Sequence, residues 1–414
     1  MTASVSFGES IQSYVSGPPV DRVIGKALAG WCLSEAEALS LATVGTEAIG
    51  DICAAASEMR LHGKGTTVTF SPKVFIPLTQ MCRDFCGYCT FRKDPKQAGE
   101  NIFMTPEQVL DVARAGAALG CTEALFTLGE RPEQRYSEAR EWLRKRGFKT
   151  TLEYLTHVCQ LVLDETEMLP HANPGTMARR EISALQPYNP SMGLMLESTS
   201  KSLYAKGGPH EFAPSKRPSV RLKTLELAGQ LRVPFTTGIL IGIGESRRDR
   251  IESLLAIADL QAQYGHIQEV IIQNFLAKPE TPMENAPNAE VDEFLWTVAV
   301  ARLILGSEAN LQVPPNLSAK DYQMYLNAGI NDWGGVSPLT IDFVNPEAPW
   351  PALIELKNKT EVAGFELKPR LPVYPEYFLA TDKFLSEPLL QKVSSMADAE
   401  GYVQGGIKRY AGRS

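Results

Sequence analysis

The chain has 414 residues, with 41 Lys or Arg against 48 Asp or Glu, so its formal net charge is −7 at pH 7. Hydrophobic residues make up 44% and charged residues 21%, which excludes a collagen-like, disordered or coiled-coil chain. The mild acidity argues against binding nucleic acid by phosphate neutralisation, and no run approaches the ~18 apolar residues that cross a bilayer. We therefore expect a globular chain with neither nucleic-acid nor membrane partners.

The N-terminal region indicates the cellular compartment of the protein and the kind of structure that precedes the first predicted strand. The first twenty residues lack the positive start and the apolar run of a secretory signal, which predicts a cytoplasmic protein with reduced cysteines. Ser34 can cap one short helix, and a second is predicted from Thr46 to about Leu61. We expect residues 1–70 to form a helical N-terminal extension.

From residue 74 onwards, short β-branched or apolar runs alternate with longer segments of helical period. The predicted strands cover residues 74–78, 124–128, 168–172, 193–196, 235–241, 269–274, 311–313 and 332–333. The predicted helices between them cover residues 105–119, 137–146, 151–164, 176–185, 219–231, 248–264, 291–305 and 322–327. This alternation predicts an α/β fold with a parallel sheet, of the size of a (β/α)8 or partial TIM barrel.

A doubly wound open sheet is the rival architecture. It requires a Gly-rich phosphate turn after the first strand, and the segment Gly242-Ile243-Gly244 lacks the third glycine and comes too late in the chain. The barrel is therefore favoured, over residues 71–365. A C-terminal extension over residues 366–414 is expected to pack on it.

Three cysteines follow the first predicted strand closely, at Cys82, Cys86 and Cys89. Thiolates so near one another can wrap one compact metal centre. Structural zinc sites use four ligands, commonly as two separated pairs, and no fourth cysteine lies nearby. Three thiolates without a fourth suit a 4Fe–4S cluster with one iron left open for a further ligand. A zinc or purely electron-carrying site with a remote fourth ligand is the alternative.

The cysteine spacing and its place after the first strand resemble the radical S-adenosylmethionine (SAM) superfamily. The resemblance implies that the open iron is chelated by SAM, which the reduced cluster cleaves to methionine and a 5′-deoxyadenosyl radical. It implies that Tyr88 packs on the adenine and that Glu130 receives the SAM ammonium, in a motif with one glycine where many members have two. The other residues that it assigns to SAM are Glu197, Gly238, Leu240, Gly242 and Asn274.

Longer segments of the sequence make the resemblance more specific within this superfamily. They lie at residues 75–91, 195–200, 206–210, 234–245 and 331–340. Together they resemble the CofG type of 7,8-didemethyl-8-hydroxy-5-deazariboflavin (FO) synthase, over roughly residues 65–370. The resemblance implies cyclisation of 5-amino-5-(4-hydroxybenzyl)-6-(D-ribitylimino)-5,6-dihydrouracil to the deazaflavin FO, with loss of ammonia. It also implies a partner radical SAM enzyme that supplies this intermediate, and an electron donor such as ferredoxin or flavodoxin.

Such a small-molecule substrate needs polar groups for its ribityl and uracil edges and a flat wall for its phenol. Candidates at or just after predicted strands are His171, Asn173, Asn316, Asp332 and Trp333. His171 and Asp332 are also candidates for proton transfer.

Three alternatives remain open. The chain could be the partner enzyme that joins a tyrosine-derived hydroxybenzyl group to ribitylaminouracil. It could be another radical SAM lyase or synthase, of the biotin, thiamine or hydrogenase-maturation type. It could also be a non-catalytic iron–sulfur or zinc scaffold, which would leave SAM uncleaved.

Overall fold

The computed structural model describes residues 19–318, 321–379 and 384–410. Its centre is a closed barrel of parallel strands, because β1 pairs with β2 on one side and with β8 on the other. The barrel strands are β1 (Thr67–Thr79), β2 (Glu123–Leu128), β3 (Leu169–Asn173), β4 (Ser191–Gly193), β5 (Phe235–Ile241), β6 (Ile267–Asn274), β7 (Leu311–Gln312) and β8 (Asp332–Val336). The predicted (β/α)8 barrel is confirmed.

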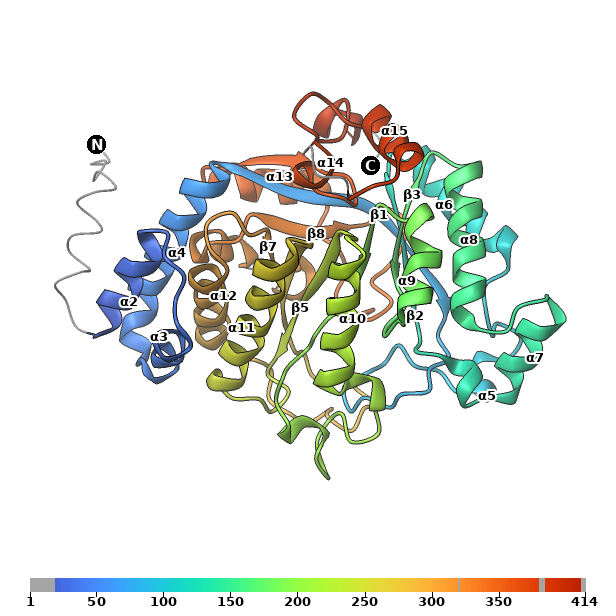
Figure 1. Cartoon of the computed structure of the whole chain (residues 1–414), viewed down its shortest axis with the longest axis horizontal. Helices are drawn as coiled ribbons and strands as arrows, with labels where there is room; N and C mark the ends of the chain where they lie inside the picture. Colours follow the sequence, from blue (N-terminus) through green and yellow to red (C-terminus); the bar gives the residue numbers. More distant parts are fainter. Residues whose placement is uncertain (1–18, 319–320, 380–383, 411–414) are drawn as a thin grey trace.

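Helices surround the barrel as an outer layer, seen side-on in Figure 1. They are α6 (Pro106–Ala118), α7 (Ser137–Lys145), α8 (Thr151–Glu165), α9 (Arg179–Leu185), α10 (Pro218–Gln230), α11 (Arg247–Tyr264) and α12 (Val291–Leu305). The start of α6 shows why this helix could be predicted from the sequence. The side chain of Thr105 accepts a hydrogen bond from Gln108 N, the side chain of Gln108 accepts one from Thr105 N, and Pro106 occupies the first turn.

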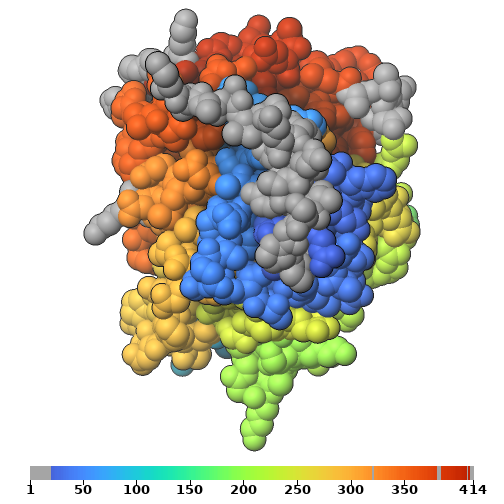
Figure 2. Space-filling view, turned by 90° about the vertical axis from the view of Figure 1, so that its left-hand side faces the viewer, coloured from blue at the N-terminus to red at the C-terminus, as the bar shows by residue number. Residues whose placement is uncertain are grey.

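The N-terminal lead-in is helical from Pro19 to Lys64, whereas residues 67–70 of the expected extension belong to β1 and residues 1–18 lie outside the described residues. It comprises α2 (Pro19–Leu28), α3 (Glu35–Ser40) and α4 (Ile49–Lys64). Ile24 and Ile52 are fully buried and belong to the same hydrophobic core as the barrel. In Figure 2 the blue atoms of this segment lie on one face of the molecule, next to the orange and yellow segments. No single helix among the described residues is long and apolar enough to span a membrane, although the bent pair Glu35–Thr43 and Thr46–Lys64 passes by length and composition alone.

The C-terminal extension covers the end of the barrel where the strands begin (Figure 1). After α13 (Leu353–Val362), a ninth strand, β9 (Glu366–Pro369), pairs in parallel with the start of β1. Strand β9 was not predicted because Pro369 is one of its four residues, but an edge strand tolerates proline. The following α14 (Pro375–Phe378) and α15 (Glu387–Met396) form a second hydrophobic cluster that includes Leu169 of β3.

Three boundaries differ from the prediction in ways that matter for the site. Strand β1 begins at Thr67, not at residue 74, so Lys73 lies inside it. Strand β8 continues beyond residue 333 to Val336, so Asp332 lies at the start of a five-residue strand, at the end opposite the cysteines. Strand β4 is Ser191–Gly193, earlier than expected.

Candidate active site

The cysteine loop leaves the carboxyl end of β1. Its three thiol-bearing residues, Cys82, Cys86 and Cys89, all line one cavity of about 340 Å³ that enters the barrel. Backbone hydrogen bonds fix the loop to its neighbours: Gly87 N donates to Pro209 O at 2.7 Å, and Met283 N donates to Gly87 O at 3.1 Å. Two other strand-end loops therefore hold the three thiols at the cavity mouth.

The surroundings of Cys82 suit a thiolate bound to a cluster. The amide of Glu130 donates to Cys82 Sγ at 3.1 Å, which stabilises charge on sulfur. Gly129 permits this approach, because a Cβ there would lie 2.8 Å from the Cys82 Cβ. Burial raises the pKa of the Cys82 thiol to about 12, a shift that a coordinating metal reverses.

Three thiols at the mouth of one cavity are the donor set of a 4Fe–4S cluster that leaves one iron open. Among the described residues, no three His, Cys, Asp or Glu side chains form a group that could hold a single metal ion. The three cysteines therefore fit the cluster expected from their spacing.

Glu130 lies beside the loop, 6% exposed, at the end of β2. Thr176 donates twice to its carboxylate, from N to Oε2 at 3.1 Å and from Oγ1 to Oε1 at 2.6 Å. Burial raises the pKa of Glu130 more than these hydrogen bonds lower it. The nearest guanidinium, that of Arg131, lies 3.5 Å from Oε1 and donates to both oxygens of Glu181 instead. A ligand ammonium group entering the cavity would give this buried carboxylate a cationic hydrogen-bonding partner.

Glu197 lies across the cavity in a left-handed backbone conformation, with φ of 68°. Hydrogen bonds to β5 hold this conformation: Glu197 N donates to Gly238 O, and Leu240 N donates to Glu197 O, each at 3.0 Å. Lys216 donates to its carboxylate, and Arg221 lies 3.9 Å away. Burial raises the pKa of Glu197, but Lys216 and Arg221 outweigh it and leave the pKa below its usual value.

Tyr88 forms an aromatic wall of the cavity. Its hydroxyl is hydrogen-bonded to His210 Nε2 at 2.8 Å, and burial lowers the pKa of His210 to about 3, so the neutral ring accepts from Tyr88. Tyr88 packs on an apolar group that contains Leu240 and Phe275. A flat ring and aliphatic side chains at one place suit an adenine face.

The two predicted SAM glycines act through the backbone. A Cβ at Gly238 would lie 2.1 Å from Ile271 O, so glycine is required where β5 and β6 approach. Gly242 has φ of +90°, and its N–H donates to Glu245 Oε1 at 2.8 Å. Neither glycine lines the cavity, whereas Leu240 between them does.

Asn274 ends β6 and lines the cavity. Its Nδ2 donates to Leu317 O at 3.2 Å, while its buried Oδ1 has no hydrogen-bond partner among the described residues. A buried acceptor without a donor is costly, so a ligand donor is expected here.

His171 and Asn173, both on β3, line the cavity, and their contact with substrate stays a prediction. Burial lowers the pKa of His171 to about 4, so its ring is neutral. Its Nδ1 lies 2.7 Å from Ser191 Oγ, whose own proton goes to Pro372 O at 2.5 Å. Ser191 therefore accepts from Nδ1–H, which leaves Nε2 of His171 as a proton acceptor.

The structure corrects the roles predicted for Asp332 and Asn316, neither of which lines the cavity. Asp332 is fully buried at the start of β8, and its carboxylate accepts from Arg370 Nε at 2.6 Å and from Thr69. These partners hold its carboxylate away from the cavity lining. Asn316 donates to Asp342 Oδ2 and Ala348 O, each at 3.1 Å, and so holds a loop.

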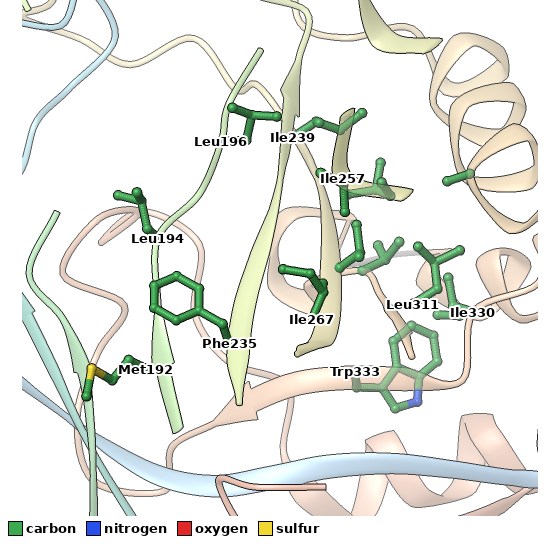
Figure 3. Packing of buried hydrophobic residues seen from close by; sticks show 14 of the residues in the cluster. Met192, Leu194, Leu196, Phe235, Ile239, Ile257, Ile267, Leu311, Ile330 and Trp333 are labelled. Atoms are coloured by element: carbon green, nitrogen blue, oxygen red, sulfur yellow. The ribbon is translucent and has the colours of Figure 1, made fainter. Parts of the chain in front are cut away.

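Trp333 also does not lie where it was predicted, at the wall of the substrate cavity. Figure 3 shows its ring beside Leu311 and Ile330, inside the hydrophobic core. It is fully buried, its Nε1 donates to Thr360 Oγ1 at 3.0 Å, and Tyr322 packs edge-on against it. The regular alternation of side chains is broken after Trp333, because Gly334 has φ of +71° and the pairing of β8 with β1 shifts register between Thr69 and Ser71. Trp333 therefore lies in the core although Gly335, two residues on, borders the cavity. Trp333 is a core residue, not a wall for substrate.

Several cavity residues escaped the sequence analysis. Lys216 and Arg221, which neutralise Glu197, come from the segment after β4 and carry no motif. Lys73 and Glu123 line the inner part of the cavity. The sequence carries a signal that could have identified them, because each is a charged residue in or beside an otherwise apolar strand.

Comparisons with known proteins agree with this geometry. Residues 76–257 match the family model described as the radical SAM superfamily. A 7,8-didemethyl-8-hydroxy-5-deazariboflavin synthase of Methanopyrus kandleri is 50% identical, over 81% of this chain and 100% of that protein. The chain belongs to the FO synthase family. Membership of the radical SAM superfamily implies a 4Fe–4S cluster and SAM.

An FO synthase of Streptomyces avermitilis is 48% identical over 96% of this chain but 47% of its own length, so the chain spans about half of that relative. Among solved structures, the hydrogenase maturase HydG from Carboxydothermus hydrogenoformans has a TM-score of 0.67 and 20% identity, over 89% of this chain and 86% of that one. This second likeness concerns the fold alone.

Proposed function

We propose that this member of the FO synthase family is a radical SAM enzyme that closes the central ring of a deazaflavin. Its substrate would be 5-amino-5-(4-hydroxybenzyl)-6-(D-ribitylimino)-5,6-dihydrouracil. Hydrogen abstraction by the 5′-deoxyadenosyl radical, ring closure onto the uracil and loss of ammonia would be followed by release of one proton and return of one electron to the cluster, which would give FO. SAM would then be the two-electron oxidant of the overall reaction. The names of the relatives support this choice, and the observation that carries it is a single cavity that joins three cysteines to a polar barrel interior.

Cys82, Cys86 and Cys89 would hold the cluster at the cavity mouth. When bound, the cluster and SAM together supply methionine and a 5′-deoxyadenosyl radical. The protein's contribution is to hold the cysteine loop fast through Gly87 and to exclude water from the cavity beneath it.

SAM would lie across the strand ends. Glu130 would receive its ammonium, since this buried carboxylate accepts its hydrogen bonds from Thr176, and the guanidinium groups of Arg131 and Arg83 lie 3.5 and 4.0 Å from Oε1 without donating to it. Tyr88 and Leu240 would border the adenine, and Asn274 Oδ1 would accept from a ligand N–H. Glu197, already paired with Lys216, would accept from ribose hydroxyls.

His171 and Asn173 would contact the substrate. Neutral His171 presents Nε2 as an acceptor, so it could take a proton released during ring closure. With its pKa lowered to about 4, the ring stays deprotonated across the physiological range.

A partner radical SAM enzyme would deliver the coupled intermediate, and a ferredoxin or flavodoxin would reduce the cluster. Anaerobic turnover tests the proposal: purified coupled intermediate, SAM and a reductant should yield 5′-deoxyadenosine, methionine, ammonium and fluorescent FO. Tyrosine and ribitylaminouracil without the partner should yield no FO. If this chain alone consumes tyrosine and forms the benzylated uracil, it performs the preceding coupling instead.

A further inference from the structure

The inner part of the cavity, toward the starts of the strands, carries charged side chains. Lys73 of β1 and Glu123 of β2 are register partners on neighbouring strands, and Lys73 Nζ lies 2.8 Å from Glu123 Oε1. Glu269 of β6 lies in the same part of the cavity lining. Burying such charges is costly, so a barrel that needed only stability would place aliphatic residues here.

Glycines on facing strands make room for these polar groups. A Cβ at Gly335 would lie 2.1 Å from Lys73 Cε, and a Cβ at Gly334 would lie 1.9 Å from Gln312 Nε2. Gly193 does the same for His171, whose Nε2 would lie 3.1 Å from an added Cβ. Gly334 and Gly335 belong to the segment 331–340, on which the family resemblance partly rests. The structural role of these two glycines is to leave room for the side chains of Lys73 and Gln312.

An apolar belt lies nearer the mouth. Two residues further along their strands, Phe75 follows Lys73, Leu125 follows Glu123, and Ile271 follows Glu269, and all three line the cavity. About six residues of β1, roughly 20 Å, separate Lys73 from the end of the strand at Thr79. The cavity is therefore long and changes from a charged inner part, through an apolar belt, to the cysteine mouth.

Arg370 closes the inner end. It comes from the C-terminal extension, and its guanidinium donates to Glu269 Oε1 at 2.7 Å and to Asp332 Oδ2 at 2.6 Å. Arg370 thereby occupies Glu269, and Ser71 donates to Glu123 Oε2. Lys73, Glu123 Oε1 and Gln312 are the polar groups that face a ligand reaching this depth.

We propose that Lys73, Glu123, His171 and Gln312 form a binding subsite for the polyhydroxylated, hydrogen-bonding end of the substrate, with its aromatic ring in the apolar belt nearer the cluster. This rests on the proposed function for the identity of the substrate. A ribityl chain offers several hydroxyls that both donate and accept. Such hydroxyls match a site in which an ammonium, a carboxylate, an amide and a neutral imidazole lie together.

Fragment binding tests the subsite directly. Ribitylaminouracil carries the polar end and p-cresol the aromatic end, and each is titrated by calorimetry into the cluster-loaded enzyme with SAM. Lys73→Met should weaken ribitylaminouracil binding by about 10- to 100-fold, the effect of losing a hydrogen bond to a charged group. Binding of p-cresol, SAM binding and iron content should stay unchanged.

Two further variants separate binding from folding. Gly335→Ala keeps Lys73 but fills its space, so it should cause the same selective loss. Lys73→Met/Glu123→Leu replaces the buried pair by apolar side chains, which proteins often tolerate, and should stay folded without binding the polar fragment. The matched control is Lys392→Met, which removes a part-buried lysine that donates to Leu163 O and Thr166 O outside the cavity.

Unchanged ribitylaminouracil affinity in Lys73→Met would overturn the subsite, and so would an equal loss of both fragments. Failure of the proposed function reads differently: wild-type enzyme would then give no FO from the coupled intermediate. A selective, Lys73-dependent affinity for the polyol fragment would in that case still establish the subsite, for another polyhydroxylated ligand.

Discussion

The buried charge cluster at the inner end of the barrel allows a quantitative prediction. Arg370 is 2% exposed and is the cationic partner of both Glu269 and Asp332, at 2.7 and 2.6 Å. The substitution Arg370→Met keeps much of the side-chain length and removes the charge. Two carboxylates would then remain buried without that cation.

Breaking a buried ion pair by removing one partner costs about 3–5 kcal/mol of folding free energy. With an m-value of about 4 kcal/mol per M urea, scaled up for a chain of this length, the unfolding midpoint should fall by about 1 M. Burial already raises the pKa of Glu269 and Arg370 lowers it, so removing Arg370 raises it further. A carboxyl whose folded pKa is raised loses stability as the pH rises through that value. The deficit of the variant should therefore shrink as the pH falls from about 8 to about 5.

Urea unfolding followed by circular dichroism at several pH values measures both effects. Arg302→Met is the matched control, because Arg302 is equally buried but donates to the backbone carbonyls of Gly306 and Gly329 and to Asn331 Oδ1. It should be destabilised without the pH-dependent recovery. An Arg370→Met deficit that is independent of pH, or that grows as the pH falls, would refute the electrostatic account.

Three further predictions concern the site. Cys86→Ser should abolish iron binding, because two thiolates do not anchor the cube, whereas Cys159→Ser on α8 should retain the iron in a chemical assay. Glu130→Gln should weaken SAM binding by about 1.5–3 kcal/mol at unchanged iron content, and an unchanged calorimetric affinity would remove Glu130 from the SAM site. Trp333→Phe should lower the unfolding free energy by about 1–2 kcal/mol through its lost bond to Thr360, while a change in substrate KM without that loss would place Trp333 against the substrate.

The strands and helices of the barrel could be predicted from the sequence because the signals that mark them involve residues close together in the chain. Hydrophobic period distinguishes strand from helix, and caps such as Thr105 mark helix starts. The cysteine loop was equally readable, since the three cysteines lie close together in the chain. The ninth strand was missed because its pairing with Thr67–Phe70 is not local and its own four residues carry a proline.

The inner part of the cavity could not be predicted in the same way, because its residues meet only when the barrel closes. The string Asp332-Trp333-Gly334-Gly335 drew attention to its two most chemically distinctive side chains, and both proved structural: Asp332 pairs with Arg370, and Trp333 packs in the core. The two residues without side chains shape the site, because Lys73 and Gln312 occupy the space that they leave. A pair of glycines in a barrel strand is therefore a signal to ask which neighbouring side chain needs the room, and in this chain the answer is a lysine 262 residues earlier in the sequence than Gly335.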